Sequence, residues 1–325
     1  MTAKRAVRSL KPTHLVALRA FDSRPSCVQV TAPSWPRSTD ADARLSLWSL
    51  LSHSVAHQAG RRRAWVYVDE GGVNGVLVGR VRSHGLVWDV RHLWADNGRE
   101  EVVAALLQRI CDDALQRGAR RIFLELPRDA PHLLVARRVG FQQYTEAALL
   151  VHPPLDGPSP SSWRPRPRAR GDEQALFQLY TAAVPAPARA AEAMTLEEWA
   201  ALHKGVRRWS PRQLAGRRQF VWDGPEGAVA WLEVAESGRS QHLEWLVHPA
   251  YERRCDEVVA GGLSYAQPRL RLYATCRAYQ PGLRTALERA GFEPVTECAV
   301  LVCQLAVRVP DRALAVAAVR STIGG

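Results

Sequence analysis

The chain has 325 residues, of which 46% are hydrophobic, and its formal net charge is +12. This length predicts two domains, and the apolar content is sufficient for two ordinary cores rather than a disordered chain. No apolar run approaches the ~20 residues that a membrane helix needs, and the charged start of the chain lacks the apolar core of a signal peptide. We therefore expect a cytoplasmic protein without a membrane partner.

The positive charge comes almost entirely from arginine. Lysine occurs only at positions 4, 11 and 204, and the other 41 basic residues are arginine. A ratio this uneven reflects coding bias better than selection for a basic face, and the densest runs lie at 61–63, before a strand, and at 164–170, in a proline-rich joint. We expect the excess charge to be spread over the surface, which argues against a nucleic-acid partner.

Apolar periodicity and turn residues divide the first half into a regular series of elements. In chain order we expect a strand at 5–10, helices at 13–21 and 42–59, strands at 64–68, 75–82 and 86–94, a helix at 99–116, a strand at 121–126, a short helix before Gly140 and a strand at 144–151. Gly118 is placed to cap the long helix.

Prolines then interrupt the pattern. Residues 152–170 contain six of them, which excludes helix and interior strand and predicts a semi-rigid linker. We divide the chain into a first domain at 1–154, a linker at 155–162 and a second domain at 163–325. The alanine-rich tail after Pro310 is either a small docked helix or a frayed end.

The second half repeats the order of the first. We expect a strand at 164–169, helices at 172–183 and 195–203, strands at 218–221, 227–236 and 240–247, a helix at 257–265, a strand at 269–275, a helix at 282–290 and a strand at 297–307. Six cysteines are scattered through the chain without a C-x-x-C pair, so neither a metal site nor a disulfide framework is expected. Cys298 and Cys303 lie five apart in one strand and should face opposite sides of it.

The halves also repeat in sequence. Residues 139–151 recur as residues 290–302 at a fixed offset of 151, with Gly, Phe, Thr, Glu, Ala, Leu and Val in matching places. Residues 101–104 recur as residues 257–260 at an offset of 156, so one indel separates the two motifs. A repeat of this length is a duplicated domain rather than a solenoid unit.

The order of elements resembles that of the GNAT (N-acetyltransferase) superfamily. The resemblance lies in the closing segment of each half, where a helix runs into Gly140-Phe141 or Gly291-Phe292, and in Val247-His248-Pro249, which is similar to the start of the GNAT cofactor loop. It covers both halves and implies a mixed α/β fold of two tandem GNAT-like acyl-CoA N-acyltransferase domains.

The resemblance also implies where acetyl-CoA, as the acyl donor, would bind. In GNAT members, backbone N–H groups at a helix N-terminus hold the CoA pyrophosphate, and glycine allows its close approach. Carried onto this sequence, the cofactor-binding residues are Leu246, Val247, Arg253, Arg254, Val258, Val259 and Ala260 in the second half, and Arg99 and Val102 in the first.

Acidic pairs occupy the glycine region in both halves. They are Glu100-Glu101 and Asp256-Glu257, and carboxylates in a first turn favour a helix that is capped by its own side chains. A negative charge roughly 5 Å from a pyrophosphate costs ~3 kcal/mol at an effective dielectric constant near 20, which is more than a hundredfold in affinity. The sequence therefore predicts a weakened acetyl-CoA site.

Candidate catalytic residues are few. Family members often carry a tyrosine as general acid one turn before the Gly-Phe pair, but Ala136 and Leu287 stand there. Many members use a strand glutamate as general base, and Glu244 is the residue that matches in the second half; the alternative is a solvated strand residue. In the first half, Asp89 and His92 occupy the corresponding strand.

Two functions remain open at this point. The resemblance implies an acyl-CoA-dependent N-acetyltransferase that transfers an acyl group to an amine, either a small molecule or a peptide, with Glu244 or a strand-bound water taking the proton. The alternative is a catalytically inactive GNAT-fold binding or scaffold protein that has lost the pyrophosphate loop. The sequence names neither the substrate nor the oligomeric state.

Overall fold

The structure is a computed structural model, and it describes residues 6–32, 62–70, 72–82, 85–155, 157, 161, 163–203, 217–237 and 240–305. The elements before the linker are β1 (Ala6–Ser9), η1 (Pro12–His14), α1 (Leu15–Asp22), β2 (Cys27–Gln29), β3 (Arg62–Asp69), β4 (Gly72–Arg82), β5 (Val87–Asp96), α3 (Glu100–Gln116), β6 (Arg121–Pro127), α4 (His132–Val139) and β7 (Gln142–His152). Those after it are β8 (Arg166–Pro167), η3 (Arg170–Asp172), α5 (Glu173–Ala183), α6 (Ala186–Glu192), α7 (Leu196–His203), β9 (Arg217–Gly224), β10 (Gly227–Ser237), β11 (Ser240–Val247), η4 (Pro249–Arg254), α8 (Cys255–Leu263), β12 (Arg271–Arg277), α9 (Pro281–Arg289) and β13 (Glu293–Gln304).

Most of the expected elements are present with shifts of a few residues at their ends. The periodic helix at 99–116 appears as α3, and Gly118 follows it with a φ of +76°, as a helix-ending glycine should. The strand β2, the helix α6 and the 3-10 helix η4 were not predicted from the sequence. The expected helix at 42–59 and the tail after Pro310 lie outside the described residues.

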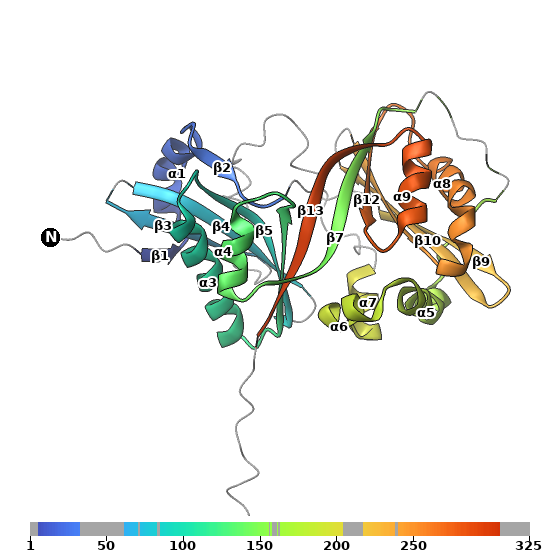
Figure 1. The fold of residues 1–325 in the computed structure, drawn as a ribbon, viewed down its shortest axis with the longest axis horizontal. Helices are drawn as coiled ribbons and strands as arrows, with labels where there is room; N and C mark the ends of the chain where they lie inside the picture. The colour runs from blue at the N-terminus through green and yellow to red at the C-terminus, as the bar shows by residue number, and fades with distance from the viewer. Residues whose placement is uncertain are drawn as a thin grey trace, which may run out of the picture.

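The described strands form one sheet of 13 strands that runs through both halves (Figure 1). Its order is β1-β3-β4-β5-β6-β13-β7-β12-β11-β10-β9-β8, and β2 pairs with β5 beside this path. The pairs β5–β6 and β11–β12 are parallel and the other pairs are antiparallel. Each half thus contributes a meander followed by one parallel crossover.

The two halves exchange their last strands. β7 closes the first half in sequence but pairs with β12, from Leu272↔His152 to Arg277↔Ala147. β13 closes the second half in sequence but pairs with β6 on one side and β7 on the other. Figure 1 shows β7 and β13 side by side at the centre of the molecule. The exchange makes the two half-sheets continuous.

Helices cover both faces of this sheet. In the second half, α8 and α9 enclose a core with Leu232, Leu243 and Trp245, while α5 and α7 pack on the other face against Val221 and Trp231. In the first half, α3 and α4 cover one face and α1 covers the other. The space between the two half-sheets, next to α5–α7, is where the site lies.

The repeated Gly-Phe landmark has the same role in each half. Gly140 and Gly291 follow α4 and α9 with φ values of +106° and +93°, a left-handed conformation that glycine adopts without strain. The phenylalanines that follow them are buried. The landmark therefore ends a helix and starts the last strand at equivalent points, as the repeat predicts.

The cysteines on β13 face opposite sides, as their spacing predicts. Cys303 lies in the core of the first half with its Sγ 4.0 Å from that of Cys111, and Cys298 lines the cavity described below. All six cysteines are free thiols. None of the described helices has both the length and the apolar character that are needed to cross a membrane.

Candidate active site

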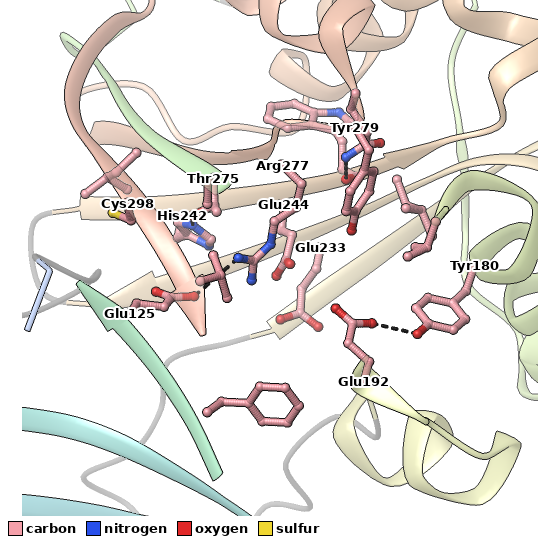
Figure 2. A pocket seen from close by; sticks show the side chains of 18 of the residues that line it. Glu125, Tyr180, Glu192, Glu233, His242, Glu244, Thr275, Arg277, Tyr279 and Cys298 are labelled. Carbon is pink, nitrogen blue, oxygen red and sulfur yellow. Dashed lines mark hydrogen bonds and ion pairs between the residues drawn. The ribbon is translucent and has the colours of Figure 1, made fainter. Parts of the chain in front are cut away.

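A cavity of about 400 Å³ opens where the two halves meet. The strands β4, β5, β6, β7 and β13 line it from one side and β9 to β12 from the other, and α5, α6 and α7 contribute Tyr180, Glu192 and Trp199. Figure 2 shows side chains from strands and helices converging on this space. The cavity is therefore built jointly, and neither half encloses it alone.

Strand periodicity decides which β11 residues reach the cavity. Leu243, Trp245 and Val247 are buried and point to the core beneath α8 and α9. The alternate residues, among them His242 and Glu244, are partly buried and line the cavity. The period of two thus places the carboxylate predicted from the sequence on the open face of the sheet.

Glu244 lies directly opposite Glu233 on β10. Glu233 is only 7% exposed, and its carboxylate accepts a 2.6 Å hydrogen bond from Gln219 Nε2 and pairs with Arg217 at 3.3 Å. Burial raises the pKa of Glu233 above its ordinary value, and the nearby charge of Glu244 raises it further. Glu244 itself has no hydrogen bond or ion pair to any described residue, so its carboxylate is available to a ligand.

A tyrosine from the turn before α9 approaches the same space. Figure 2 shows Tyr279 and Glu244 directed into one part of the cavity. Burial raises the pKa of Tyr279, so its hydroxyl stays protonated at neutral pH. Within the part of the chain that the structure describes, this hydroxyl makes no hydrogen bond. It can therefore donate a proton to a bound group.

The neighbouring polar side chains are held in pairs. Arg277 Nη1 lies 3.3 Å from Glu125 Oε1, which joins β12 to β6 across the exchanged strands. His242 Nε2 lies 2.8 Å from Thr275 Oγ1, and burial lowers the pKa of His242, which favours its neutral form. These pairs fix the floor of the cavity on either side of Glu244.

The helices over the cavity are tied to the sheet by a second network. Glu192 on α6 accepts hydrogen bonds from Tyr180 at 2.6 Å and from Tyr144 at 3.3 Å. Arg121 on β6 is 4% exposed, and it pairs with Glu198 at 3.1 Å and donates to the backbone carbonyl of Glu192. Because Arg121 and Tyr144 belong to the first half, this network docks the second-half helices onto it.

The parallel strands of the second half part just beyond Glu244. Their pairing ends at Glu244↔Thr275, and the next polar groups on the freed edge of β11 bind a side chain instead. The N–H of Val247 donates to Gln280 Oε1 at 3.1 Å, and Gln280 Nε2 donates to the carbonyl of Trp245 at 3.3 Å. The amide of Gln280, which is 8% exposed, thus replaces a peptide group of the missing neighbour strand.

The corresponding gap in the first half contains main chain. Pairing of β5 with β6 ends at Asp89↔Phe123, and the segment that includes β2 then runs between the two strands. The N–H of Val30 donates to the carbonyl of Leu93 at 2.8 Å, and the N–H of Ala32 donates to the carbonyl of Glu125 at 2.9 Å. This segment therefore bridges both edges of the gap.

The predicted phosphate-binding turn of the second half is η4 followed by α8. Arg254 pairs with Glu257 at 2.7 Å and stacks over the ring of Trp163 with its guanidinium carbon 3.6 Å from the centroid. Asp256 pairs with Arg289 at 3.0 Å. Arg253 is exposed. The carboxylates here are thus partly neutralised by arginines.

The rest of the predicted cofactor residues are divided between core and surface. Val258 and Val259 on α8 and Val247 on β11 are buried, Ala260 is half-buried, and Leu246 lines the cavity. In the first half, Val102 is buried and Arg99 pairs with Asp69 at 2.9 Å and with Glu101 at 3.0 Å. Of the nine residues, Leu246 therefore faces the cavity. Arg253 is exposed on the surface and has no ion pair to a described residue.

The acidic pairs of α3 and α8 bind arginines. The residues at the N-caps of these helices, Arg99 and Arg254, make no side-chain cap hydrogen bond. Glu100 pairs with Arg138 at 3.6 Å and Glu101 with Arg99, just as the pair on α8 binds arginines. Arginine is abundant in this chain, and a charge-assisted pair competes well with a helix N–H for a carboxylate.

Comparison with solved structures identifies the arrangement. A GCN5-related N-acetyltransferase from Sphaerobacter thermophilus superposes with a TM-score of 0.57 at 14% identity, covering 93% of this chain and 96% of the other. A tandem GNAT protein from the clavulanic acid biosynthesis pathway gives 0.51 at 13% identity, covering 93% and 99%. This chain has the tandem GNAT fold. A putative acetyltransferase from Pyrococcus horikoshii gives 0.51 at 9% identity, covering 93% and 90%.

The sequence comparisons add nothing to this fold assignment, because no protein-family model and no curated protein matches the chain. Ala136 and Leu287, which stand where GNAT members often carry a general acid, are buried in the cores. Tyr279 and Gln280 were missed by sequence reasoning. A tyrosine and a glutamine directly before the proline that starts a helix were the available signal, since such a turn faces the ends of the parallel strands.

Proposed function

We propose that the protein is an acyl-CoA-dependent N-acyltransferase whose acceptor site is the cavity between the halves. The observation that carries the proposal is Glu244, a carboxylate without an ion pair or hydrogen bond to any described residue. It lies on the strand next to the parallel gap and faces a cavity, in a chain with the tandem GNAT fold. Acyl transfer from acyl-CoA to an amine is common among proteins with this fold, and the roles proposed for Glu244 and Tyr279 are specific to this chain.

The chemistry requires a base and an acid near the gap. Glu244 accepts a proton from the ammonium of the acceptor, so that the neutral amine attacks the thioester carbonyl carbon. A carbon–nitrogen bond forms and the carbon–sulfur bond breaks. Tyr279 supplies a proton to the departing thiolate, and the second proton that the acylated nitrogen loses restores the phenol. The buried Glu233 lies directly across from Glu244 on β10, and its charge is balanced by Arg217 at 3.3 Å.

The residues fit the acyl donor in one half only. The arm of coenzyme A that carries the thiol contains amide groups, and these can pair with a free strand edge as an added strand does. In the first half β2 occupies that edge. In the second half, the described residue that closes the edge is Gln280, whose side chain can turn away. We therefore assign the donor to the second half, between β11 and β12.

A thiol-release assay tests the proposal. The full chain is incubated with acetyl-CoA and a panel of amines, and free CoA is measured against time. We expect amine-dependent release that falls about 10²–10⁴-fold in Glu244→Gln, as removal of a general base does. The matched control is Glu226→Gln, an exposed glutamate in the turn between β9 and β10. Equal rates in wild type and Glu244→Gln would contradict the assignment.

A second candidate function, ligand binding without acyl transfer, is supported by a separate observation. Both strand edges that an acyl-CoA could use are occupied, by β2 and by Gln280, as they would be in a GNAT-fold protein that binds a ligand without acyl transfer. Calorimetric titration of wild type with acetyl-CoA separates the two. Micromolar binding supports the transferase, whereas no binding to wild type or to Gln280→Ala supports the binding protein.

A further inference from the structure

Among the described residues that line the cavity, two opposite charges, Glu244 and Arg91, have neither an ion pair nor a hydrogen bond, whereas Glu192 accepts hydrogen bonds from Tyr180 and Tyr144. Most charged side chains that line it are matched: Glu233 with Arg217, and Glu125 with Arg277. Glu244, at the second-half end, is unpaired among the described residues. At the first-half end the same holds for Arg91, which lies on β5 and lines the cavity.

Arg91 has little compensation from its own strand. The nearest carboxylate along β5 is Asp89, and its ion pairs go to Arg80, at 2.7 Å, and to Arg82. Burial lowers the pKa of Arg91 to about 10, and the positive charge of Arg80 contributes to the decrease. An anionic group bound beside Arg91 would therefore relieve an unfavourable accumulation of positive charge.

The geometry points to an acceptor that carries both a free amine and a distant carboxylate, bound with the amine at Glu244 and the carboxylate at Arg91. This inference rests on the proposed function, because it names the substrate class of the same site. A ligand with the amine alone would leave Arg91 without an opposite charge. A ligand with the carboxylate alone would leave Glu244 without one.

The sheet sets the length of this ligand. β5 and β11 are separated by β6, β13, β7 and β12, so five spacings of about 4.8 Å place the paired parts of the two strands roughly 24 Å apart along the sheet. Arg91 lies two residues beyond the last β5–β6 pair, where the segment with β2 separates these strands further. The two side chains reach inward and shorten that span. Since an extended peptide residue covers at most about 3.3–3.6 Å, a peptide of roughly three to five residues fits, whereas a single amino acid is too short.

The middle of the cavity suits a peptide backbone. Glu125 and Arg277 lie between the two ends and can exchange their mutual bond for hydrogen bonds to an amide N–H and an amide carbonyl. Phe123 and Tyr144, whose ring centroids are 6.1 Å apart, add an aromatic wall. The acceptor is thus inferred to be a short peptide or a molecule with the same spacing of charges and amides.

Calorimetry with glycine peptides tests the inference in the absence of any acyl donor. The probes are tri-, tetra- and pentaglycine, each as the free peptide, as its C-terminal amide and as its N-acetyl derivative. We expect at least one free peptide to bind about tenfold or more tightly than either blocked form of the same length. Equal affinity of the three forms, or no binding of any of them, would overturn the inference.

Two substitutions locate the charges. Glu244→Gln should weaken the free and amidated peptides and leave the N-acetyl peptide unchanged, because only the amine is lost as a partner. Arg91→Gln should weaken the free and N-acetyl peptides and leave the amide unchanged, while Arg91→Lys retains the preference. Arg8→Gln, an exposed arginine on β1, is the control. If Arg91→Gln fails to fold, the blocked peptides on wild type still decide.

Failure of this inference is distinguishable from failure of the proposed function. Preference for the free peptide without any acyl transfer would contradict the transferase alone. Acyl transfer to amines with no preference for a distant carboxylate would contradict the substrate class alone.

Discussion

In the first half the gap between the parallel strands is filled by main chain, and in the second half it is filled by one side chain. The segment with β2 bonds to both β5 and β6, whereas the side-chain amide of Gln280 bonds to β11 alone among the described strands. Main chain in a sheet is removed only by unfolding, but a side chain moves by rotation about its own bonds. Two copies of one fold have therefore diverged into a closed gap and a gap that can open.

The largest expected effect comes from disrupting the main-chain filling. Val30→Pro removes the N–H that donates to Leu93 and should reduce the free energy of unfolding by about 3 kcal/mol or more, measured by urea denaturation. Val30→Ala is the matched control, because it keeps the N–H and should be milder. A proline variant as stable as wild type would show that β2 is not an integral part of the sheet.

Opening the second gap should affect binding more than stability. Gln280→Ala frees the N–H of Val247 and the carbonyl of Trp245, and we expect acetyl-CoA to bind about tenfold more tightly, or by about 1.4 kcal/mol. Titration calorimetry of both proteins measures this. A weaker complex in the variant would mean that Gln280 holds the donor rather than excluding it.

We expect a smaller gain in acetyl-CoA affinity from removing the acidic pair on α8. The double variant Asp256→Gly and Glu257→Gly should bind acetyl-CoA about two- to fivefold more tightly, because both carboxylates are exposed and already paired with arginines. The matched variant, with glycine in place of Glu100 and Glu101, should gain nothing, since β2 fills that half. Unchanged micromolar binding in every variant would remove the case for a weakened site.

The smallest effect concerns the pH dependence of stability. Burial raises the pKa of Glu233 above the ordinary value of 4.5, so the folded state loses stability as the pH rises from 4.5 to the raised folded-state pKa, and the full loss persists above it. Glu233→Gln should therefore have a higher Tm than wild type at pH 7 and a similar Tm near pH 4, in thermal scans with Glu226→Gln as control. A lower Tm at pH 7 would show that the bond with Gln219 and the ion pair with Arg217 outweigh burial.

Much of the fold follows from local sequence, because helices and meander strands are set by periodicity and turn glycines. The exchange of β7 and β13 does not. Both strands carry a Thr-Glu-x-Ala motif, at Thr145 and Thr296, so each matches either neighbour equally well. The choice between β6 and β12 depends on contacts far apart in the chain, which no local pattern encodes.

The site was predicted in the same uneven way. Glu244 could be placed because strand alternation puts its side chain on the other face of β11 from its buried neighbours Leu243 and Trp245. β2 was missed because a strand of three residues is too short to show a measurable periodicity. Arg91 could not be singled out among 41 arginines, since its distinguishing property is the lack of an ion pair within the described residues, and that is visible only in three dimensions.

The exchanged strands also bear on how the chain is made. The first half leaves the ribosome early, yet the strand that lies between its β6 and β7 is β13, near the end of the sequence. Domains of many multidomain proteins fold as units in the order of their synthesis, but here the first half must wait with an open edge until translation is nearly complete. The earliest part of the polypeptide to be synthesised is among the last to be finished, and the contacts that complete it have the long sequence separation that slows folding.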